Sequence, residues 1–410
     1  MEVVYPRCCG LDIHKDVLVA CRITPGEHGR LKKELETFGA TTDEILRLGD
    51  WLAAVGCTHL AMESTGVYWK PIWNLLEGQV ELLLVNAQHV KAVPGRKTDV
   101  QDSEWLADLL RHGLLRPSFV PDRAQRELRE LTRYRASLVR ERTAEVNRLQ
   151  KTLEGANIKL GSVATDIMGK SGRQMLGQLV AGQTDPTALA DLAKGRLRAK
   201  IPALERALTG RFGAHQCFLV GQQLAHIDYL DEVIARLSAE IAERVRPFED
   251  ALTRLDAIPG VGRITAEVIV AELGTDMSRF PTDAHAASWA ALCPGHHESA
   301  GKRQSGKTRK GNRSLRVALV EAAHAAGKTH HTYLSAQYHR FAARRGKKKA
   351  AVAVAHTILV IAYHLLADDH ASYTDLGSDF FDRRNQDALE RRLVQRLEQL
   401  GNKVTIERVA

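Results

Sequence analysis

The chain has 410 residues, enough for two or three domains with cores of ordinary size, and its 44% hydrophobic and 26% charged residues are typical of a globular protein. The net charge of +9 is concentrated in one region: residues 299–367 hold 14 Lys and Arg against one acid, Glu321, so the rest is net acidic. Such a local excess favours a surface that binds a polyanion.

Three classes of protein are disfavoured. The six cysteines show no CxxC pair and are too few for a disulfide framework, so we expect buried thiols. The N-terminus lacks the basic region and apolar run typical of a signal peptide, and the apolar run at 350–366 falls short of the about 20 residues that span a bilayer. We therefore expect a cytoplasmic, nucleoid-associated protein with no membrane partner, and a buried helix over the apolar run.

Residues 7–116 alternate between strand-like and helical patterns. Strands are predicted at 7–23, with a break near His14 and Lys15, and at 57–64 and 79–86. Helices are predicted at 41–56, at 67–77 with an interruption at Pro71, and at 97–113, ending at Gly113. This order predicts an α/β domain over residues 1–120, with a mixed sheet and helices on its faces.

Four acids of this domain suit a metal site. Asp12 and Glu63 end predicted strands, and Asp99 and Asp102 lie three apart at a helix start, on one face. Hard oxygen ligands suit Mg²⁺ or Mn²⁺, and two such ions clamp the attacking and leaving oxygens of a phosphodiester. With 13 Lys and Arg against 16 acids, residues 1–120 attract cations better than nucleic acid. Alternatively, the helical pair only favours the helix dipole and the strand-end acids are incidental.

Residues 121–250 favour long helices. Leucines recur at helical steps from Leu128 to Leu153, and Val220, Ile227, Ile234 and Ile241 lie seven residues apart. A stripe of about three heptads predicts a coiled coil, either an antiparallel hairpin or a dimerisation arm. The intervening residues 160–212 are expected to be helical.

Residues 251–370 predict a helical domain, and the tail 371–410 contains one amphipathic helix at 388–403. The segment LDAIPGVGRITAEVIVAELG at 255–274 resembles a helix-hairpin-helix. Gly260 and Gly262 let the backbone turn and, with Arg263, present donors to a DNA phosphate. A plain turn between two helices has the same glycines.

Ser299 lies just before a stretch of cations in a glycine-rich loop, which we expect to be mobile, with a helix starting near Ser314. These cations are Lys302, Arg303, Lys307, Arg309, Lys310, Arg313 and Arg316. A serine attacks a phosphate where positive charge neutralises that phosphate and a base removes the proton, and His296, His297 and Glu298 are the nearest candidates. Alternatively, the serine fills a loop beside a solvated basic face.

Five motifs occur in the order found in one known family. GLDIHK, MESTGVYW, KTDVQD, IPGVGRITAEVIVAELG and ESAGKRQSGKTRKGNRSLR together resemble the DEDD-type insertion-sequence transposases, the bridge-RNA-guided recombinases of bacterial mobile elements, over about residues 1–370. The resemblance implies a ribonuclease-H-like (RuvC-like) domain, a coiled-coil hairpin and a helical transposase domain with a helix-hairpin-helix.

The resemblance also implies roles. Asp12, Glu63, Asp99 and Asp102 match the metal-binding acids, and Ser299 matches a serine that attacks a DNA phosphate and leaves a covalent phosphoserine. It implies donor DNA, target DNA and a noncoding bridge RNA as partners, with a site shared between protomers of a dimer or tetramer.

Three positions depart from the family pattern. Ala300 follows Ser299 where glycine is usual, Glu298 stands where a second serine is often found, and Ser103 replaces a frequent alanine. Ala300 narrows the backbone freedom of the serine loop. Two rival hypotheses stay open: a junction endonuclease that uses water as nucleophile, and a non-catalytic coiled-coil protein that binds nucleic acid.

Overall fold

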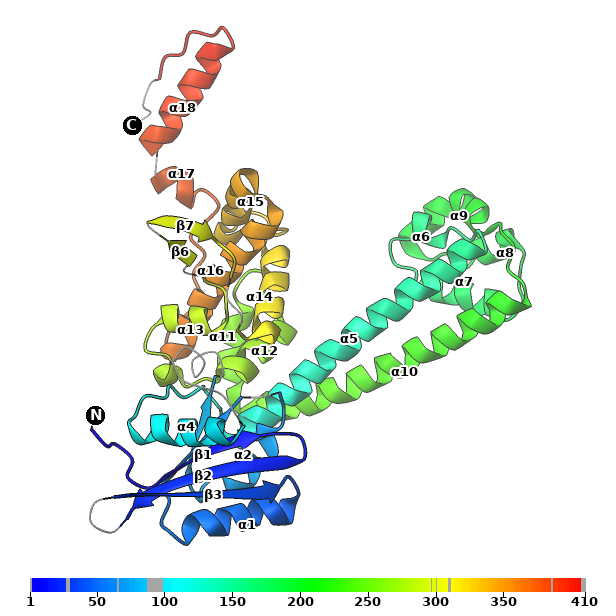
Figure 1. Cartoon of the computed structure of the whole chain (residues 1–410). Helices are drawn as coiled ribbons and strands as arrows, with labels where there is room; N and C mark the ends of the chain where they lie inside the picture. The colour runs from blue at the N-terminus through cyan, green and yellow to red at the C-terminus, as the bar shows by residue number, and fades with distance from the viewer. Residues whose placement is uncertain are drawn as a thin grey trace. The chain divides into compact units, whose positions relative to one another are not determined.

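The computed structural model describes residues 2–26, 30–64, 66–86, 99–295, 297–299, 301–308, 311–384 and 386–406 (Figure 1). The chain forms two compact units, Met1–Arg123 and Ala124–Ala410, and each is described by itself.

The first unit is built on a five-stranded sheet with the order β3-β2-β1-β4-β5. Its strands are β1 (Cys8–Ile13), β2 (Val17–Pro25), β3 (Leu31–Gly39), β4 (His59–Glu63) and β5 (Glu81–Val85). The pairs β1–β2 and β2–β3 are antiparallel, whereas β1–β4 and β4–β5 are parallel. The predicted mixed sheet is confirmed, and its strand order and directions are consistent with a ribonuclease-H-like fold.

Helices cover both faces of this sheet, and the alternation of side chains along the strands decides which residue faces which helix. Cys9, Leu11 and Ile13 of β1 pack with side chains of α1 (Thr42–Ala53) and α2 (Trp69–Leu76). Cys8, one position out of phase, packs on the opposite face with Ala107 and Leu110 of α4 (Asp99–Arg111). Gly113 follows α4 with a φ of +65°, so the predicted end of this helix is confirmed.

Two local features differ from the sequence-based expectation. The edge strand β3 is not predicted by its sequence, LKKELETFG, because four of its nine residues are charged and only Phe38 is fully buried. The helix at 67–77 is not interrupted by Pro71. Helix α2 begins at Trp69, which puts Pro71 in the first turn, where the missing N–H has no partner to lose.

The second unit contains a long helical hairpin formed by α5 (Arg123–Gly155) and α10 (Ala214–Val245). Arg244 bonds to Glu127 at 2.9 Å, Arg142 to Asp231 at 3.0 Å and Gln223 to Thr152 at 3.2 Å, so the two helices run antiparallel. Val220, Ile227 and Ile241 of the predicted stripe are fully buried, and Ile234 is half-buried. The hairpin is thus closed within one chain.

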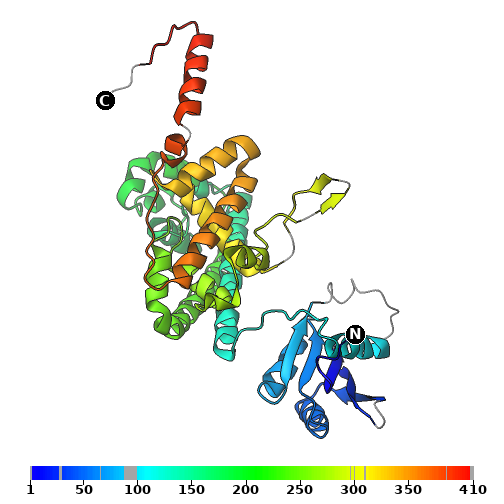
Figure 2. The same ribbon diagram turned by 90° about the vertical axis from the view of Figure 1, so that its left-hand side faces the viewer.

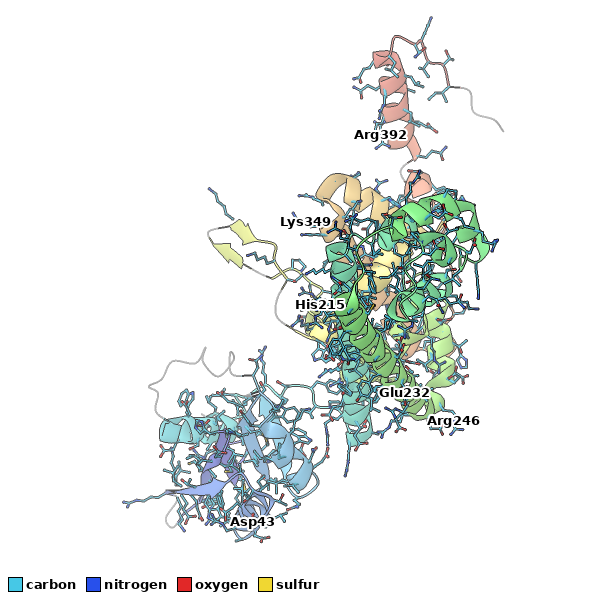
Figure 3. The ribbon with its side chains drawn as sticks, turned by 90° about the vertical axis from the view of Figure 1, so that its right-hand side faces the viewer. Asp43, His215, Glu232, Arg246, Lys349 and Arg392 are labelled. Atoms are coloured by element: carbon cyan, nitrogen blue, oxygen red, sulfur yellow. The ribbon has the colours of Figure 1, made fainter. Side chains whose placement is uncertain are left out.

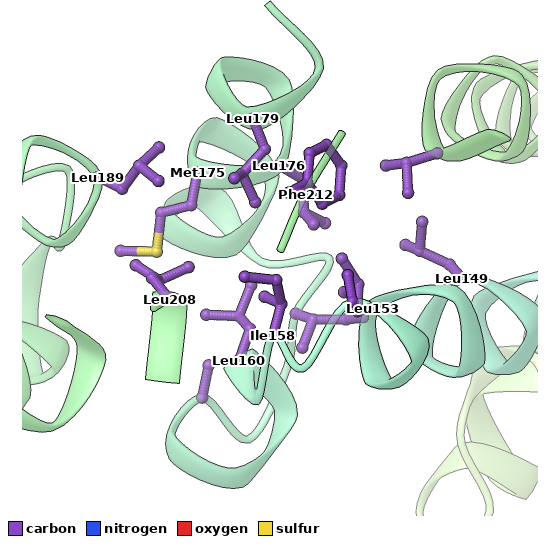
Figure 4. Packing of buried hydrophobic residues seen from close by; sticks show 14 of the residues in the cluster. Leu149, Leu153, Ile158, Leu160, Met175, Leu176, Leu179, Leu189, Leu208 and Phe212 are labelled. Carbon is purple, nitrogen blue, oxygen red and sulfur yellow. The ribbon is translucent and has the colours of Figure 1, made fainter. Parts of the chain in front are cut away.

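Short helices fill the far end of this hairpin, as expected for residues 160–212. They are α6 (Leu160–Val163), α7 (Lys170–Val180), α8 (Pro186–Ala190), the 3-10 helix η2 (Gly195–Lys200) and α9 (Ile201–Leu208). Their apolar side chains form one cluster with the ends of α5 and α10, including Leu153, Met175, Leu176 and Phe212 (Figure 4).

The remainder of the second unit is a helical bundle around α16 (Lys347–Ala367). Helices α11 (Glu249–Asp256), α13 (Asp283–Trp289), α14 (Arg313–Ala326) and α15 (Tyr333–Arg345) contact α16, and α12 (Arg263–Leu273) packs on α11 and α14. Helix α16 alone, in the described part of the chain, has the length and hydropathy of a membrane span, and half of that window is buried. This burial fits the core helix predicted for 350–366.

The tail follows the bundle with α17 (Phe380–Arg384) and α18 (Gln386–Gln399). Leu393, Leu397 and Leu400 of this segment are exposed. A helix is thus present over 388–399 of the segment 388–403 in which one is predicted, and it ends at Gln399.

Candidate active site

The first two predicted acids lie on neighbouring parallel strands. Leu11 of β1 is level with Met62 of β4, so Asp12 and Glu63 are each one residue further along the same pair of strands. Because parallel neighbours at the same register point to the same face, both carboxyl groups lie on one side of the sheet. Ala61, two residues before Glu63, packs against α4, and therefore that side is the one that α4 covers.

The packing of α4 on β1 explains how the helical acids reach this place. A Cβ atom on Gly10 would lie 2.3 Å from the Ser103 carbonyl oxygen and 2.4 Å from the Ala107 nitrogen, so only glycine lets α4 approach so closely. The Cys8 thiol lies 3.6 Å from the carbonyl oxygen of Ala107. Moving from Cys8 to Gly10 thus leads toward the N-terminus of α4.

One more step of two residues along β1 leads to Asp12, and one more turn along α4 leads to Asp102 and Asp99. The topology therefore directs Asp12, Glu63 and the N-terminal turn of α4 to the same corner of the first unit. Asp102 is half-buried, and the Asp99 side chain lies outside the described residues. Asp12 is 17% exposed and its Oδ2 lies 3.1 Å from Nε2 of His14.

The donor set of this corner fits a hard divalent cation. Carboxylate oxygens are the ligands that Mg²⁺ and Mn²⁺ accept, and Asp12 and Glu63 are neighbours in the sheet. Within the described side chains, no three Asp, Glu, His or Cys groups are close enough to hold one ion. The fourth predicted ligand, Asp99, belongs to the part of the site outside that set.

The buried cysteines of the same unit do not add ligands. Burial raises the pKa of Cys8 and Cys21 to about 12 and of Cys57 to about 11, so these thiols stay protonated near neutral pH. All six cysteines are free, and the prediction of buried thiols is confirmed for Cys8, Cys9, Cys21 and Cys57.

The helix-hairpin-helix segment forms the turn between α11 and α12. Gly260 has a φ of +88°, and a Cβ there would meet the Ala322 carbonyl oxygen at 2.3 Å, so this glycine seats the turn on α14. Gly262 precedes α12, and a Cβ there would meet open space. The N-terminus of α12 is thus the open side of this turn.

Arg263, predicted to contact DNA, is engaged by two acids. Its Nη2 bonds to Oε2 of Glu249 at 2.8 Å, and its Nε bonds to Oε1 of Glu267 at 3.2 Å. The hydrogen bond with Glu249 raises the pKa of the arginine. A phosphate at this turn would compete with Glu249 for the guanidinium.

The predicted serine loop contains a small β-hairpin. Strands β6 (His297–Ser299) and β7 (Lys302–Ser305) pair antiparallel, with Ser299 opposite Lys302 and Glu298 opposite Arg303 (Figure 2). Gly301 has a φ of +73°, as a tight turn between two strands requires. Part of the expected irregular loop is therefore paired strand, which glycine-based reasoning missed. The side chains of Ser299 and Arg303 lie outside the described residues, as do Arg309 and Lys310 entirely.

Four of the predicted cations have described side chains, and they lie in this hairpin or shortly after it in the sequence. Lys302, Lys307 and Arg313 are exposed, and Arg316 is half-buried and donates from Nη1 to Oγ1 of Thr308 at 3.1 Å. The helix predicted near Ser314 is α14, which starts at Arg313. Ser299 and these cations are thus brought together in the second unit, whereas the four acids belong to the first.

The base of the serine loop is held by backbone contacts. Gly295 donates to the Lys307 carbonyl oxygen at 2.9 Å, and Pro294 pairs with Thr308. Asn312 donates from its backbone nitrogen to the Trp289 carbonyl oxygen at 3.2 Å. The two ends of the loop are therefore fixed to each other and to the end of α13.

A buried network of ion pairs, which the sequence-based reasoning missed, reaches the same point. Glu272 of α12 is fully buried, accepts from Nε and Nη2 of Arg133 at 2.7 Å each, and accepts from Nδ2 of Asn312 at 2.6 Å. Arg135 lies 2.7 Å from Glu267, and both side chains are only 5% exposed. The signal was present: Glu267 and Glu272 are two acids in an apolar helix, and buried acids need cationic partners.

Comparisons with known proteins match two separate segments of the chain. A family model described as a transposase, of the DEDD type, matches residues 9–158, and a model described as the transposase of the IS116/IS110/IS902 family matches residues 252–340. The chain is 26% identical to the transposase for insertion sequence element IS1111A of Coxiella burnetii, over 88% of this chain and 89% of the relative.

Two further relatives come from Streptomyces. An uncharacterized protein of insertion element IS116 from Streptomyces clavuligerus is 31% identical over 52% of this chain and 60% of its own length. An uncharacterized protein of insertion element IS110 from Streptomyces coelicolor is 28% identical over 73% of this chain and 76% of its own length.

Proposed function

Because the chain belongs to the IS116/IS110/IS902 family of transposases, which cleave and transfer DNA strands, we propose that Ser299 is its nucleophile. We further propose that Asp12, Glu63, Asp99 and Asp102 form the divalent-cation site that a DEDD-type domain implies, with Mg²⁺ or Mn²⁺ as the ion. Family membership removes the non-catalytic alternative.

The observation that carries the acid site is the shared register of Asp12 and Glu63 under the N-terminus of α4. Two carboxylates on adjacent strands repel each other unless a cation lies between them, and Gly10 lets the backbone of α4, whose first turn carries Asp99 and Asp102, pack directly on β1. When bound, the cation would stabilise charge on the phosphate oxygens. The acids of this chain would orient the cation, and the phosphate would be held by the cations near Ser299.

The serine step follows from ordinary acyl- and phosphoryl-transfer chemistry. The Oγ atom of Ser299 attacks the phosphorus and its proton passes to a base, for which His296, His297 and Glu298 are the nearest candidates in sequence. The bond from phosphorus to the sugar oxygen breaks, and that oxygen leaves as a hydroxyl group after taking up a proton. A phosphoserine ester retains the bond energy, so the reverse attack by another sugar hydroxyl rejoins the strand.

The cations near Ser299 support this role. Lys302 follows at the tight turn of the β6–β7 hairpin, and Lys307, Arg313 and Arg316 lie on the same loop and the first turn of α14. Positive charges of this kind neutralise a phosphate and the charge that develops on it. Arg303, Arg309 and Lys310 extend the same basic stretch, and Gly260, Gly262 and Arg263 offer a second backbone contact.

Guidance by a noncoding bridge RNA and assembly as a dimer or tetramer in the cytoplasm belong to the same proposal. The support for them is the family resemblance together with the excess of basic residues at 299–367. In such a system base pairing selects the sequence, and the protein holds RNA and DNA through shape and backbone.

The test is to trap the covalent intermediate. Wild-type protein, incubated with a labelled DNA duplex of the element ends and Mg²⁺, is expected to form a denaturation-resistant DNA adduct that maps to Ser299. Ser299→Ala should remove both cleavage and adduct while DNA binding survives. Ser305→Ala, on the opposite strand of the same hairpin, is the matched control and should retain both.

The rival hypothesis predicts a different pattern. If water is the nucleophile, Ser299→Ala still cuts, with no adduct from either protein. Cleavage that persists in Ser299→Ala would therefore replace the serine mechanism with a junction-type endonuclease.

A further inference from the structure

We infer that the end of the α5–α10 hairpin, residues 156–213, binds the phosphate backbone of duplex DNA through a basic segment at 194–211. We call residues 156–213 the tip. This surface is distinct from the serine loop and the acid site. It rests on the family's action on DNA strands and is independent of which group is the nucleophile.

The tip is far larger than a reversal of direction requires. Two antiparallel helices can be joined by about 2–5 residues, whereas 58 residues lie between the end of α5 and the start of α10. These residues pack into one apolar core with the ends of α5 and α10, and Ile158, Leu160, Met175, Leu189, Leu204 and Leu208 are all buried in it (Figure 4). A packed core makes the tip a folded body that can present side chains on a fixed surface.

The tip has an excess of positive charge, with nine Lys and Arg against four Asp and Glu. Six of these cations occur within 18 residues around η2 and α9, where Glu205 is the only acid: Lys194, Arg196, Arg198, Lys200, Arg206 and Arg211. All six are exposed, and among the described residues none of them forms an ion pair. Arg198 and Lys200 donate only to the carbonyl oxygens of Ala193 and Val163, so their charge is not compensated.

Two of the four acids of the tip accept hydrogen bonds from nearby backbone nitrogens, and the two long helices of the hairpin carry nearly equal numbers of positive and negative residues. Asp185 accepts from the backbone nitrogens of Thr187 and Ala188 at the start of α8, and Asp166 accepts from that of Met168. Helices α5 and α10 together hold 11 Lys and Arg against 10 acids. The positive charge of the hairpin is thus concentrated at its far end, as expected for a polyanion contact and not for general solubility. Figure 3 draws the described side chains on the ribbon.

The length of α5 determines how far away this contact lies. Arg129 donates to the Ala271 carbonyl oxygen of α12, and Leu153 belongs to the core of the tip, 24 residues further along α5. At 1.5 Å per residue the tip is about 36 Å from the α12 contact. At 3.4 Å per base pair this is about one helical turn of DNA. The tip therefore contacts backbone beyond the duplex that the helix-hairpin-helix holds.

The experiment compares full-length protein with a variant carrying Lys194→Ala, Arg196→Ala, Arg206→Ala and Arg211→Ala. Binding is measured by fluorescence anisotropy with random-sequence duplexes of about 15 and about 40 base pairs over a series of salt concentrations. The variant should bind the long duplex at least about 10-fold more weakly. Its slope of log K against log salt should be lower by about 3 to 4, because each lost phosphate contact removes about 0.9. Binding to the short duplex should change less than about twofold.

Controls separate charge from folding and from other partners. The charge-preserving variant Lys194→Arg, Arg196→Lys, Arg206→Lys, Arg211→Lys should bind the long duplex like wild type, and both variants should unfold at the wild-type temperature because the changed side chains are exposed. Unchanged affinity and salt slope for the long duplex would overturn the inference. So would a loss seen only with a structured RNA, or only in the oligomeric state.

Discussion

The side chain of Asn312 joins two elements at once: its Oδ1 accepts from the backbone nitrogen of Leu315 at 3.0 Å, and its Nδ2 donates to Oε2 of Glu272 at 2.6 Å. The first contact caps α14, and the second ties that cap to the buried ion network between α12 and α5. Since Asn312 directly follows the basic serine loop, the long hairpin and the loop share one fixed point.

Asn312→Ala removes both contacts and should be the more harmful of two matched cap deletions. We expect a loss of about 2–4 kcal/mol in the free energy of unfolding, about 1 from the cap and the rest from a buried carboxylate that loses a donor. Thr332→Ala removes the cap of α15, where Oγ1 accepts from Ser335 at 3.2 Å, and should cost about 1 kcal/mol. Chemical denaturation measures both, and equal losses would contradict a role for Glu272.

The Arg135–Glu267 pair should behave as a buried ion pair: each single substitution should lower the free energy of unfolding more than the double substitution does. Glu267→Leu leaves the Arg135 charge buried without a carboxylate, which costs about 3–5 kcal/mol. Arg135→Met leaves Glu267 with Arg263 as its remaining cationic partner. The double variant removes both charges and should be less destabilised than either single. Arg263 also contacts Glu267, so Arg263→Met serves as the exposed control and should cost less than about 1 kcal/mol. Additive losses in the double variant would argue against the pair.

Gly10→Ala tests whether close packing of α4 positions the acid site. Its Cβ would overlap the Ser103 carbonyl oxygen, so α4 must move away from β1. We expect a loss of about 1–3 kcal/mol in stability from overpacking, together with loss of strand cleavage at temperatures where the protein is still folded. Gly177→Ala in α7 meets no atom within 4 Å and should be neutral or slightly stabilising. Full cleavage activity in a folded Gly10→Ala protein would separate α4 from the site.

The buried thiols predict both a labelling pattern and a pH dependence. Cys8, Cys9, Cys21 and Cys57 should resist a thiol reagent in the folded protein, whereas Cys217 and Cys293, which are half-exposed, should react. Burial raises the pKa of Cys8 from 9 to about 12, so the unfolded state loses that proton first. The contribution of the protonated Cys8 thiol to the free energy of unfolding is therefore fully present below pH 9 and is lost as the pH rises from 9 to about 12. Cys8→Ala should show a shallower fall in melting temperature over that range.

Much of this architecture follows from local sequence signals. The apolar runs of β1, β4 and β5, the heptad positions of α10 and the glycine after α4 each act over a few residues, and the predictions that use them are confirmed. The features that were missed depend on tertiary context. Strand β3 is charged because it is a sheet edge, and Gly10 matters only because α4 crosses it. The network around Glu272 joins residues about 140 positions apart, which periodicity cannot reveal.

Divalent cations provide the sharpest test of the acid site, because the expected effect of Asp12→Asn on the melting temperature differs in sign with and without the metal. Without metal, Asp12 and Glu63 repel each other, so Asp12→Asn should leave the melting temperature unchanged or raise it. With Mg²⁺ or Mn²⁺ at about 100 times the Kd, wild-type protein gains about 2.7 kcal/mol, and Asp12→Asn should lose that gain. Asp16→Asn changes an exposed acid in the turn after β1 and should keep the full metal-induced shift. Thermal unfolding with a metal titration measures these three proteins and Glu63→Gln. If Asp12→Asn and Glu63→Gln both retain the metal-induced shift in melting temperature, the cation binds elsewhere. If Asp16→Asn also loses the shift, metal stabilisation reflects general surface charge, because Asp16 does not share the register of β1 and β4 that brings the two acids together.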